Sequence, residues 1–140
     1  MNKFSSSKNK FTLFILGSLI VFFTIILILN ITEKTANTFP IIALGILISL
    51  ILWIVLDTRY VLKNNLLLYR SGPFRGSIPV HTILKIKKHS GLNVPVLMKP
   101  ALDTDGFIIT TKNSELFISP KSSILFMEEL KKINPNIEVI

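Results

Sequence analysis

The sequence contains no cysteine, and only two of its 140 residues are histidine. Without cysteine the chain has no disulfide, no thiolate ligand for a metal and no cysteine nucleophile. It also lacks a Walker-type phosphate loop and a G-x-G-x-x-G motif. Its serines have no neighbouring His–Asp pair that would suggest an activated nucleophile. These absences disfavour catalysis, and we expect a protein without enzymatic activity and without a cofactor.

The few side chains suited to metal binding have poor spacing for it. His81 and His89 are the only histidines, and Asp103 and Asp105 are the acidic candidates nearest to them in sequence. The run DTDG, which contains both aspartates, resembles the start of a calcium loop but lacks the third carboxylate, and Ser114 stands where the bidentate glutamate should be. We therefore expect no metal site and interpret the aspartates as turn residues whose side chains cap the backbone.

Acidic residues are scarce: eight stand against sixteen lysines and arginines, which gives a net charge of +8. Such a balance favours nucleic acid or an anionic membrane surface as a partner. Nucleic-acid binding would need exposed aromatic side chains interleaved with the basic residues. The aromatic residues of the second half stand at positions that we expect in a core: Tyr60, Tyr69, Phe107, Phe117 and Phe126. We therefore expect no nucleic-acid partner and favour a membrane.

Two long runs without charge occupy much of the first half, at residues 11–29 and 39–56. Helices of this length would span roughly 28 and 27 Å, close to the thickness of a bilayer's hydrocarbon core. We predict transmembrane helices at residues 11–30 and 39–57, joined by a short extracytoplasmic loop at 31–38. A cleaved signal peptide is one alternative, but the first run is too long and no A-x-A-like site follows it. The other alternative is a pair of helices buried in a soluble protein. The rest of the chain is too small to bury two uninterrupted apolar runs of this length.

Basic residues flank the two runs on their outer sides, whereas the loop between them is neutral. They are Lys3, Lys8 and Lys10 before the first run, and Arg59, Lys63, Arg70 and Arg75 after the second. The positive-inside rule then predicts a basic cytoplasmic N-terminus at residues 1–10 and a multi-pass protein of the cell membrane with both ends cytoplasmic. Trp53 is expected as an anchor at the membrane interface. Gly45 and Ser49, four residues apart, form a small-residue face that would let helices approach closely.

After residue 57 the pattern changes from all-apolar to alternating. Asn64–Asn65 predicts a type I′ hairpin turn, because asparagine tolerates a positive φ. The pairing that follows places Tyr60, Leu62, Leu67 and Tyr69 on one face. That face is purely apolar and aromatic, as a half-buried antiparallel pair requires.

The remaining sequence predicts further strands and one helix. The expected order is turn-rich residues at 71–77, two strands within 78–90 broken near 81–82, an irregular connection to 106, and a hairpin with its tip at 112–114. Ser119–Pro120 predicts a helix start, with the serine as cap. The helix should run through Lys132 and stop at Asn134–Pro135. The fold class is thus two N-terminal transmembrane helices and a small α+β domain, mainly antiparallel β, over residues 58–140.

Three stretches of this domain together resemble the YyaB-like bacterial PH domain family. They are the Tyr60–Gly72 hairpin, the Ile78–Ile86 segment, and Ile118-Ser119-Pro120 followed by Phe126, Leu130 and Asn134-Pro135. The resemblance covers about residues 58–137. It implies a PH-like fold, which is a small curved sheet or split barrel closed at one end by a C-terminal helix, and it implies no enzymatic activity. Members are often preceded by membrane helices. Gly106 stands where such sequences often carry a charged residue, so no role is transferred to that position.

We therefore expect a non-enzymatic, membrane-anchored PH-like interaction module at the cytoplasmic face of a bacterial membrane. Its expected partners are the lipid bilayer and a membrane or cytoplasmic protein of unknown identity, and a homo-oligomer stays open. One alternative is an immunity or stress-protection protein against an envelope-directed toxin or antibiotic. The other is a sensor of anionic lipid, for which the candidate contacts are Lys85, Lys87 and Lys88. Each basic residue near such a surface contributes about 1 kcal/mol.

Overall fold

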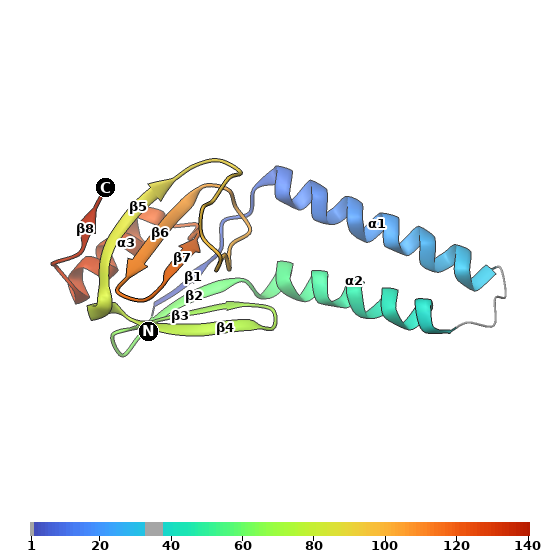
Figure 1. Cartoon of the computed structure of the whole chain (residues 1–140), viewed down its shortest axis with the longest axis horizontal. Coiled ribbons are helices and arrows are strands. Elements are labelled where there is room, and N and C mark those ends of the chain that lie inside the picture. Colours follow the sequence, from blue (N-terminus) through green and yellow to red (C-terminus); the bar gives the residue numbers. More distant parts are fainter. Residues whose placement is uncertain (1, 33–37) are drawn as a thin grey trace.

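A computed structural model describes residues 2–32 and 38–140 of the chain. Two long helices, α1 (Lys10–Thr32) and α2 (Phe39–Asp57), project together from one end of a small domain (Figure 1). The predicted loop at 31–38 lies largely outside the described residues. The domain contains β1 (Asn2–Ser5), β2 (Arg59–Lys63), β3 (Leu66–Ser71), β4 (Phe74–Pro79), the 3-10 turn η1 (Val80–Thr82), β5 (Ile83–His89), β6 (Gly106–Thr111), β7 (Glu115–Ile118), α3 (Ser123–Ile133) and β8 (Glu138–Val139).

Both long helices are apolar on all sides, and none of their described side chains is buried. Their hydroxyl groups donate back to the same helix: Ser18 Oγ to Phe14 O at 2.8 Å, and Ser49 Oγ to Gly45 O at 2.8 Å. Such internal pairing suits a lipid environment, which offers no other hydrogen-bond partner. By length and composition, both helices can cross a membrane. Among the described residues, a Cβ added to Gly45 would meet nothing within 4 Å, so the small-residue face at Gly45 and Ser49 forms no close helix contact at Gly45.

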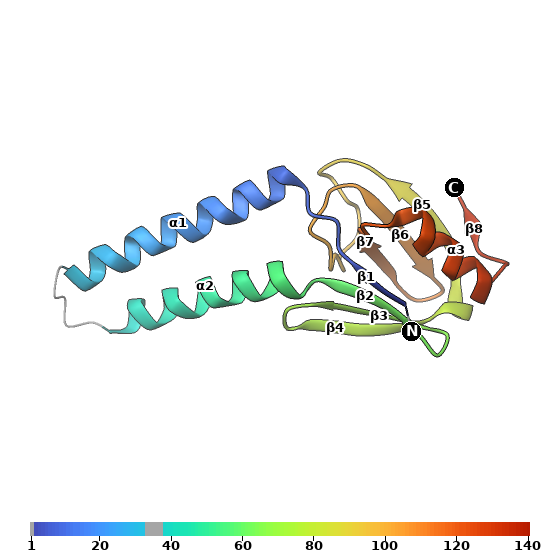
Figure 2. The same cartoon turned by 180° about the vertical axis from the view of Figure 1, so that it is seen from behind.

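Two four-stranded sheets form the domain, and its predicted fold class is confirmed. Their strand orders are β1-β2-β3-β4 and β7-β6-β5-β8, antiparallel throughout except for the β5–β8 pair. Viewed from behind, α3 lies across the second sheet (Figure 2). One core joins both sheets and this helix, with Tyr60 and Leu67 from the first sheet, Ile86 and Ile109 from the second, and Phe126 from α3.

The predicted first hairpin is confirmed residue by residue. Tyr60 pairs with Tyr69 and Leu62 with Leu67. Asn64–Asn65 forms the turn with φ angles of 52° and 59°, as a type I′ turn demands. The predicted apolar face is the inward one, because Tyr60, Leu62 and Leu67 are all buried.

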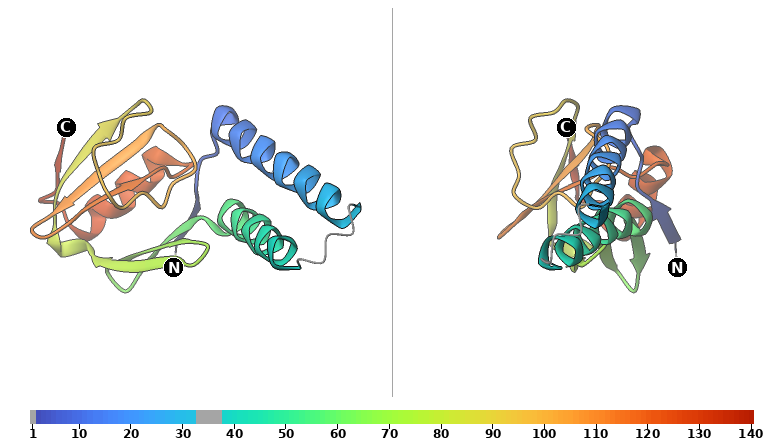
Figure 3. Two further views of the ribbon diagram at one scale, coloured as in Figure 1. Left: turned by 45° about the vertical axis from the view of Figure 1, so that its right-hand side comes forward. Right: turned by 90° about the vertical axis from the view of Figure 1, so that its right-hand side faces the viewer.

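The N-terminal residues contribute a strand that the sequence did not predict. The sequence-based boundaries leave residues 1–10 outside the domain, yet β1 pairs with β2 at the edge of the first sheet (Figure 3). Phe4 of β1 is buried, with its ring 5.1 Å from that of Phe126 and edge-on to it. Just beyond β1, the Ser6 N–H donates to Thr58 O at 3.3 Å. The chain therefore leaves for the helices and returns from them at adjacent points.

Two local predictions in the domain are wrong. The turn-rich stretch 71–77 contains only one turn, at Gly72–Pro73, and most of it belongs to β3 and β4. The helix begins at Ser123 rather than at Ser119–Pro120. Ser119 is buried instead, and its N–H donates to Tyr60 Oη at 3.1 Å. A serine–proline pair suits a helix start locally, but here the tertiary hydrogen bond of Ser119 holds it beside β1 and β2.

Candidate interaction surface

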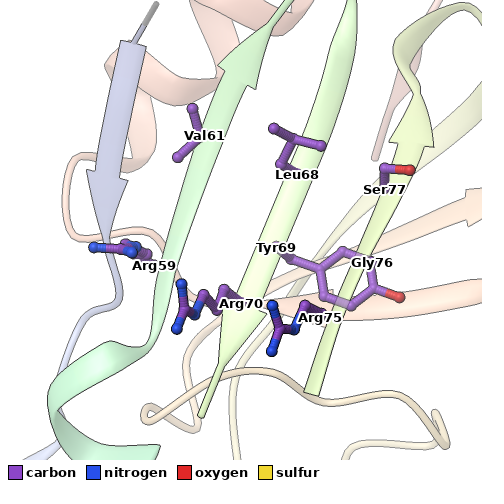
Figure 4. Close-up of a pocket in the computed structure, with 8 residues that line it drawn as sticks. All are labelled: Arg59, Val61, Leu68, Tyr69, Arg70, Arg75, Gly76 and Ser77. Atoms are coloured by element: carbon purple, nitrogen blue, oxygen red, sulfur yellow. The ribbon is translucent and has the colours of Figure 1, made fainter. Parts of the chain in front are cut away.

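Three arginines lie side by side on the outer face of the first sheet. The register pairs Arg59 with Arg70, and Arg70 with Arg75, across β2, β3 and β4. Residues paired across antiparallel strands share a face of the sheet, so the three side chains form one row (Figure 4). We call Arg59, Arg70 and Arg75 the arginine row.

The last residue of α2 contacts two members of this row. Asp57 Oδ1 lies 3.4 Å from Arg59 Nη2, and Asp57 Oδ2 contacts Arg70 Nε in a second ion pair. Within residues 2–32 and 38–140, no carboxylate forms an ion pair with Arg75, whose side chain is exposed. Three positive charges thus face one negative charge, and the surface stays positive where the domain meets α2.

A shallow groove of about 400 Å³ adjoins the arginine row. Val61, Leu68 and Ser77 form the next cross-strand row, and Val61 and Leu68 give the groove an apolar floor (Figure 4). At its rim the ring of Tyr69 lies over Gly76. A Cβ on Gly76 would collide with the Tyr69 hydroxyl, so only glycine leaves room for the ring at the edge of the sheet.

The outer edge of β4 carries backbone groups that no strand among the described residues covers. The Val80 N–H donates to Asn65 O at 2.9 Å, which marks that pair as hydrogen-bonded. In an antiparallel pair the hydrogen-bonded and non-hydrogen-bonded positions alternate, so the backbone groups of Arg75 and Ser77 point away from β3. Pro79, which has no N–H, follows at the next outward position.

The other strand edges are covered or short. The edge of β7 accepts a neighbour, since the Phe117 N–H donates to Met98 O at 2.9 Å, and the segment after β1 pairs with residues 119–121. β8 has only two residues. Within the part of the chain that the structure describes, β4 is therefore the longest open strand edge, with six residues.

The β3–β4 turn touches the end of α2. Gly72 has a φ of +56°, which suits the first position of a type II′ turn, and a Cβ added to it would lie only 2.8 Å from Ile54 Cγ1. Ile54 lies within the last turn of α2, three residues before Asp57. Phe74, directly after the turn, is 62% exposed. This contact holds the turn and the adjacent arginine row level with the end of the helix.

The three lysines predicted as lipid contacts lie on β5 but not on one face. Lys85 and Lys87 alternate with the buried Ile86, so they point outward. Lys88 shares the side of Ile86 and lines a hollow beside α3 with Met127. Their role as lipid contacts stays a prediction. Trp53 is half-exposed in the last turns of α2, and its role as an interface anchor also stays a prediction.

Of the two aspartates in the DTDG run, Asp103 caps the backbone as expected, whereas the Asp105 carboxylate accepts from the Ser90 hydroxyl. Asp103 accepts from the Ser7 hydroxyl at 2.5 Å and from the Asp105 N–H at 3.2 Å. His89 lies edge-on to the Phe117 ring at 5.9 Å. Over residues 2–32 and 38–140, no three His, Asp or Glu side chains are grouped in a way that could hold a metal ion.

The sequence contained part of the signal for the arginine row. The turn predicted at Asn64–Asn65 sets a register in which Arg59 falls opposite Arg70 on the outer face, and the structure has this pair. Arg75 was missed because the stretch around it was interpreted as a turn rather than as a strand. With Gly72–Pro73 assigned as a two-residue turn, Arg75 would have fallen opposite Arg70.

Comparison with known proteins identifies one family. A family model described as "Bacterial PH domain" matches residues 58–134, a little over half of the chain. The match begins just before β2 and ends where α3 is capped at Asn134. No curated protein and no solved structure is similar enough to the chain to count as a match.

Proposed function

Because the chain belongs to the bacterial PH domain family, we propose that it is a non-enzymatic interaction module held at the cytoplasmic face of a bacterial membrane by α1 and α2. The tether supports this function. Only Thr58 separates the end of α2 from the start of β2. So short a connection raises the effective concentration of the domain for neighbours in the same bilayer and lowers it for the rest of the cell.

The pairing of β1 with β2 supports the orientation. The two strands flank the helix pair in sequence and hydrogen-bond to each other. If α1 and α2 both cross a membrane, the residues before α1 and after α2 must lie on the same side. The lysines before α1 and the arginines after α2 favour the cytoplasm as that side.

Cysteine labelling in intact cells tests this orientation, since the chain has no cysteine of its own. A membrane-impermeant maleimide should label Thr32→Cys, at the far end of α1, and should spare Lys121→Cys on the domain until the cells are permeabilised. Labelling of Lys121→Cys alone in intact cells would show that the domain lies outside the cell, opposite to the proposed orientation. Labelling of both would contradict a helix pair that crosses the membrane.

The open edge of β4 is the observation that carries the interaction role. An extended segment of a partner protein can pair with the outward backbone groups of Arg75 and Ser77, adding a fifth strand to the first sheet. The adjacent groove, with Val61 and Leu68 on its floor, can receive alternate side chains of such a segment. We propose β-strand addition at this edge as the mode of binding.

Crosslinking followed by purification of the full chain from its native membrane tests the binding mode. Ser77→Pro removes an outward N–H without removing a bond to β3, and Ser77→Ala keeps that N–H and serves as the matched control. We expect a stoichiometric protein partner with the original chain and with Ser77→Ala, and its loss with Ser77→Pro. Retention by Ser77→Pro would exclude the β4 edge. Recovery of only the chain and lipid would contradict the interaction function.

A further inference from the structure

We propose that the arginine row binds the phosphate groups of anionic phospholipids in the leaflet from which α2 emerges, while the β3–β4 turn inserts beside α2. This inference rests on the part of the proposed function in which α2 spans the membrane. It differs from the predicted lysine contacts in residues, strand and face. It shares Arg75 and the adjacent groove with the proposed partner site at the edge of β4, and the variants below distinguish lipid from protein at the arginine row.

The first observation that supports this proposal is the position of the arginine row relative to α2. Arg59 lies two residues after the helix ends, and its cross-strand neighbours Arg70 and Arg75 lie at the same level. The Gly72–Pro73 turn continues past this level and touches Ile54, which is about one helical turn inside α2. A helix that leaves the hydrocarbon core at Asp57 therefore places all three arginines in the zone of the lipid headgroups.

The ion pairs of Asp57 carry the second step. They hold Arg59 and Arg70 beside the end of the helix, and they leave Arg75 with no carboxylate partner among the described residues. Guanidinium groups bind phosphate through two parallel hydrogen bonds. A row with two positive charges in excess suits lipid phosphates, which the membrane supplies at this depth at high local concentration.

The exposed side chains around the turn carry the third step. Phe74 is 62% exposed and Leu56, near the end of α2, is 78% exposed. Phe74 lies one strand position nearer the turn than Arg75, on the opposite face of the sheet, and Leu56 directly precedes Asp57. Apolar side chains below a layer of basic ones are the arrangement of segments that bind at a membrane interface, where the apolar groups enter the acyl region and the cations stay with the phosphates.

Lipid retention by the full chain tests the arginine row. The chain is reconstituted in bilayers of equal phosphatidylglycerol and phosphatidylcholine and released gently, and its bound lipids are counted by native mass spectrometry. Arg75→Gln removes a charge that has no ion pair, and Lys87→Gln on β5 removes the same charge elsewhere. We expect retention of phosphatidylglycerol over phosphatidylcholine to fall about fivefold for Arg75→Gln, the factor for one basic residue at an anionic surface, and to stay unchanged for Lys87→Gln.

Triple variants extend this comparison at equal charge. Arg59→Gln/Arg70→Gln/Arg75→Gln should abolish the preference, whereas Lys85→Gln/Lys87→Gln/Lys88→Gln should keep it. An equal loss of lipid preference in both triple variants would show that only net charge matters, and it would overturn the proposal. A loss confined to the lysine triple would move the lipid site to β5. If the arginine variants lost a protein partner with no change in bound lipid, the row would belong to the protein interface.

Fluorescence quenching by brominated lipids tests the insertion of the turn. Trp53→Phe/Phe74→Trp leaves one tryptophan at the turn, and Trp53→Phe/Leu84→Trp places one on β5, which begins at the end of the domain away from the helices (Figures 1 and 2). We expect bromines near the headgroup end of the acyl chains to quench the first variant severalfold more than the second. Equal quenching would overturn the insertion. Alkaline extraction of the membranes separately establishes whether α1 and α2 are embedded.

Discussion

The Tyr60 hydroxyl lies where four segments of the chain meet. It donates to Pro100 O at 2.6 Å and accepts from the Ser119 N–H at 3.1 Å, and Ser6 Oγ lies 3.4 Å away. The Ser6 hydroxyl in turn accepts from the Leu102 N–H at 3.2 Å. One buried side chain thus satisfies backbone groups of the connection before β6 and of the connection before α3, and it ties both to β2.

Tyr60→Phe should therefore lower the stability of the domain. The substitution leaves the Pro100 carbonyl and the Ser119 N–H buried without their partner, which costs about 1–3 kcal/mol of unfolding free energy. Tyr69→Phe is the matched control, because the half-buried ring of Tyr69 points past β4 (Figure 4) and its loss of a hydroxyl should cost little. Pulse proteolysis of the two variants in detergent measures the difference. Equal stability of Tyr60→Phe and the original chain would show that this network contributes nothing.

Because of the same hydroxyl, the folding stability of the domain should depend on pH in the alkaline range. Burial raises the pKa of Tyr60 above its ordinary value near 10.0, because desolvation of the phenolate outweighs the hydrogen bonds from Ser119 and Ser6. In the unfolded chain the group therefore loses its proton first, so stability that is fully present below pH 10 declines as the pH rises toward the folded-state pKa. We expect the stability difference between the original chain and Tyr60→Phe to shrink over this range. An unchanged difference up to pH 11 would contradict a raised pKa.

At the scale of elements, local patterns predicted strands whose partners are near in sequence. The β2–β3 hairpin follows from alternation and the Asn64–Asn65 turn, and the β6–β7 hairpin follows in the same way. β1 could not be predicted from local pattern. Its four residues are too few to show an alternation of apolar and polar side chains, and its partner strand lies more than fifty residues away. The start of α3 was missed for a related reason. The capping pattern at Ser119 is local, whereas the bonds that decide its position come from Tyr60 and Ser6.

The contribution of β1 can be measured through its one buried aromatic residue. Phe4 packs edge-on against Phe126 in the main core, so Phe4→Ala should lower the unfolding free energy of the domain by about 3–5 kcal/mol. Phe74→Ala removes the same group from an exposed position and should change stability in detergent by less than about 0.5 kcal/mol. If both substitutions had the same small effect, β1 would not be an integral strand of the sheet.

At the scale of the whole molecule, the two long helices are an insertion within one folded body. The sheet begins before α1 and resumes after α2, and the two junctions are adjacent, with the Ser6 N–H bonded to Thr58 O. The family match covers only the part after α2, so residue patterns in that part cannot reveal that the domain includes a strand from the other side of the helix pair. Any fragment that starts at residue 57 or 58 leaves Phe126 without Phe4 and leaves the edge of β2 open.

A chimera in which about four Gly or Ser residues replace residues 10–56 should therefore fold as a soluble domain. The Ser6 N–H donates to Thr58 O at 3.3 Å, so three extended residues carry Asn9 at most about 10 Å beyond that junction, and four added residues reach about 13 Å. Asp57 stays, so that Arg59 and Arg70 keep their ion pairs. We expect the chimera to unfold cooperatively on heating, and fragment 57–140 to melt at a clearly lower temperature or to aggregate, because it lacks β1. Equal melting temperatures would show that β1 adds nothing to the fold. An unfolded chimera beside a folded fragment would show that the strand needs the helix pair to hold it in register.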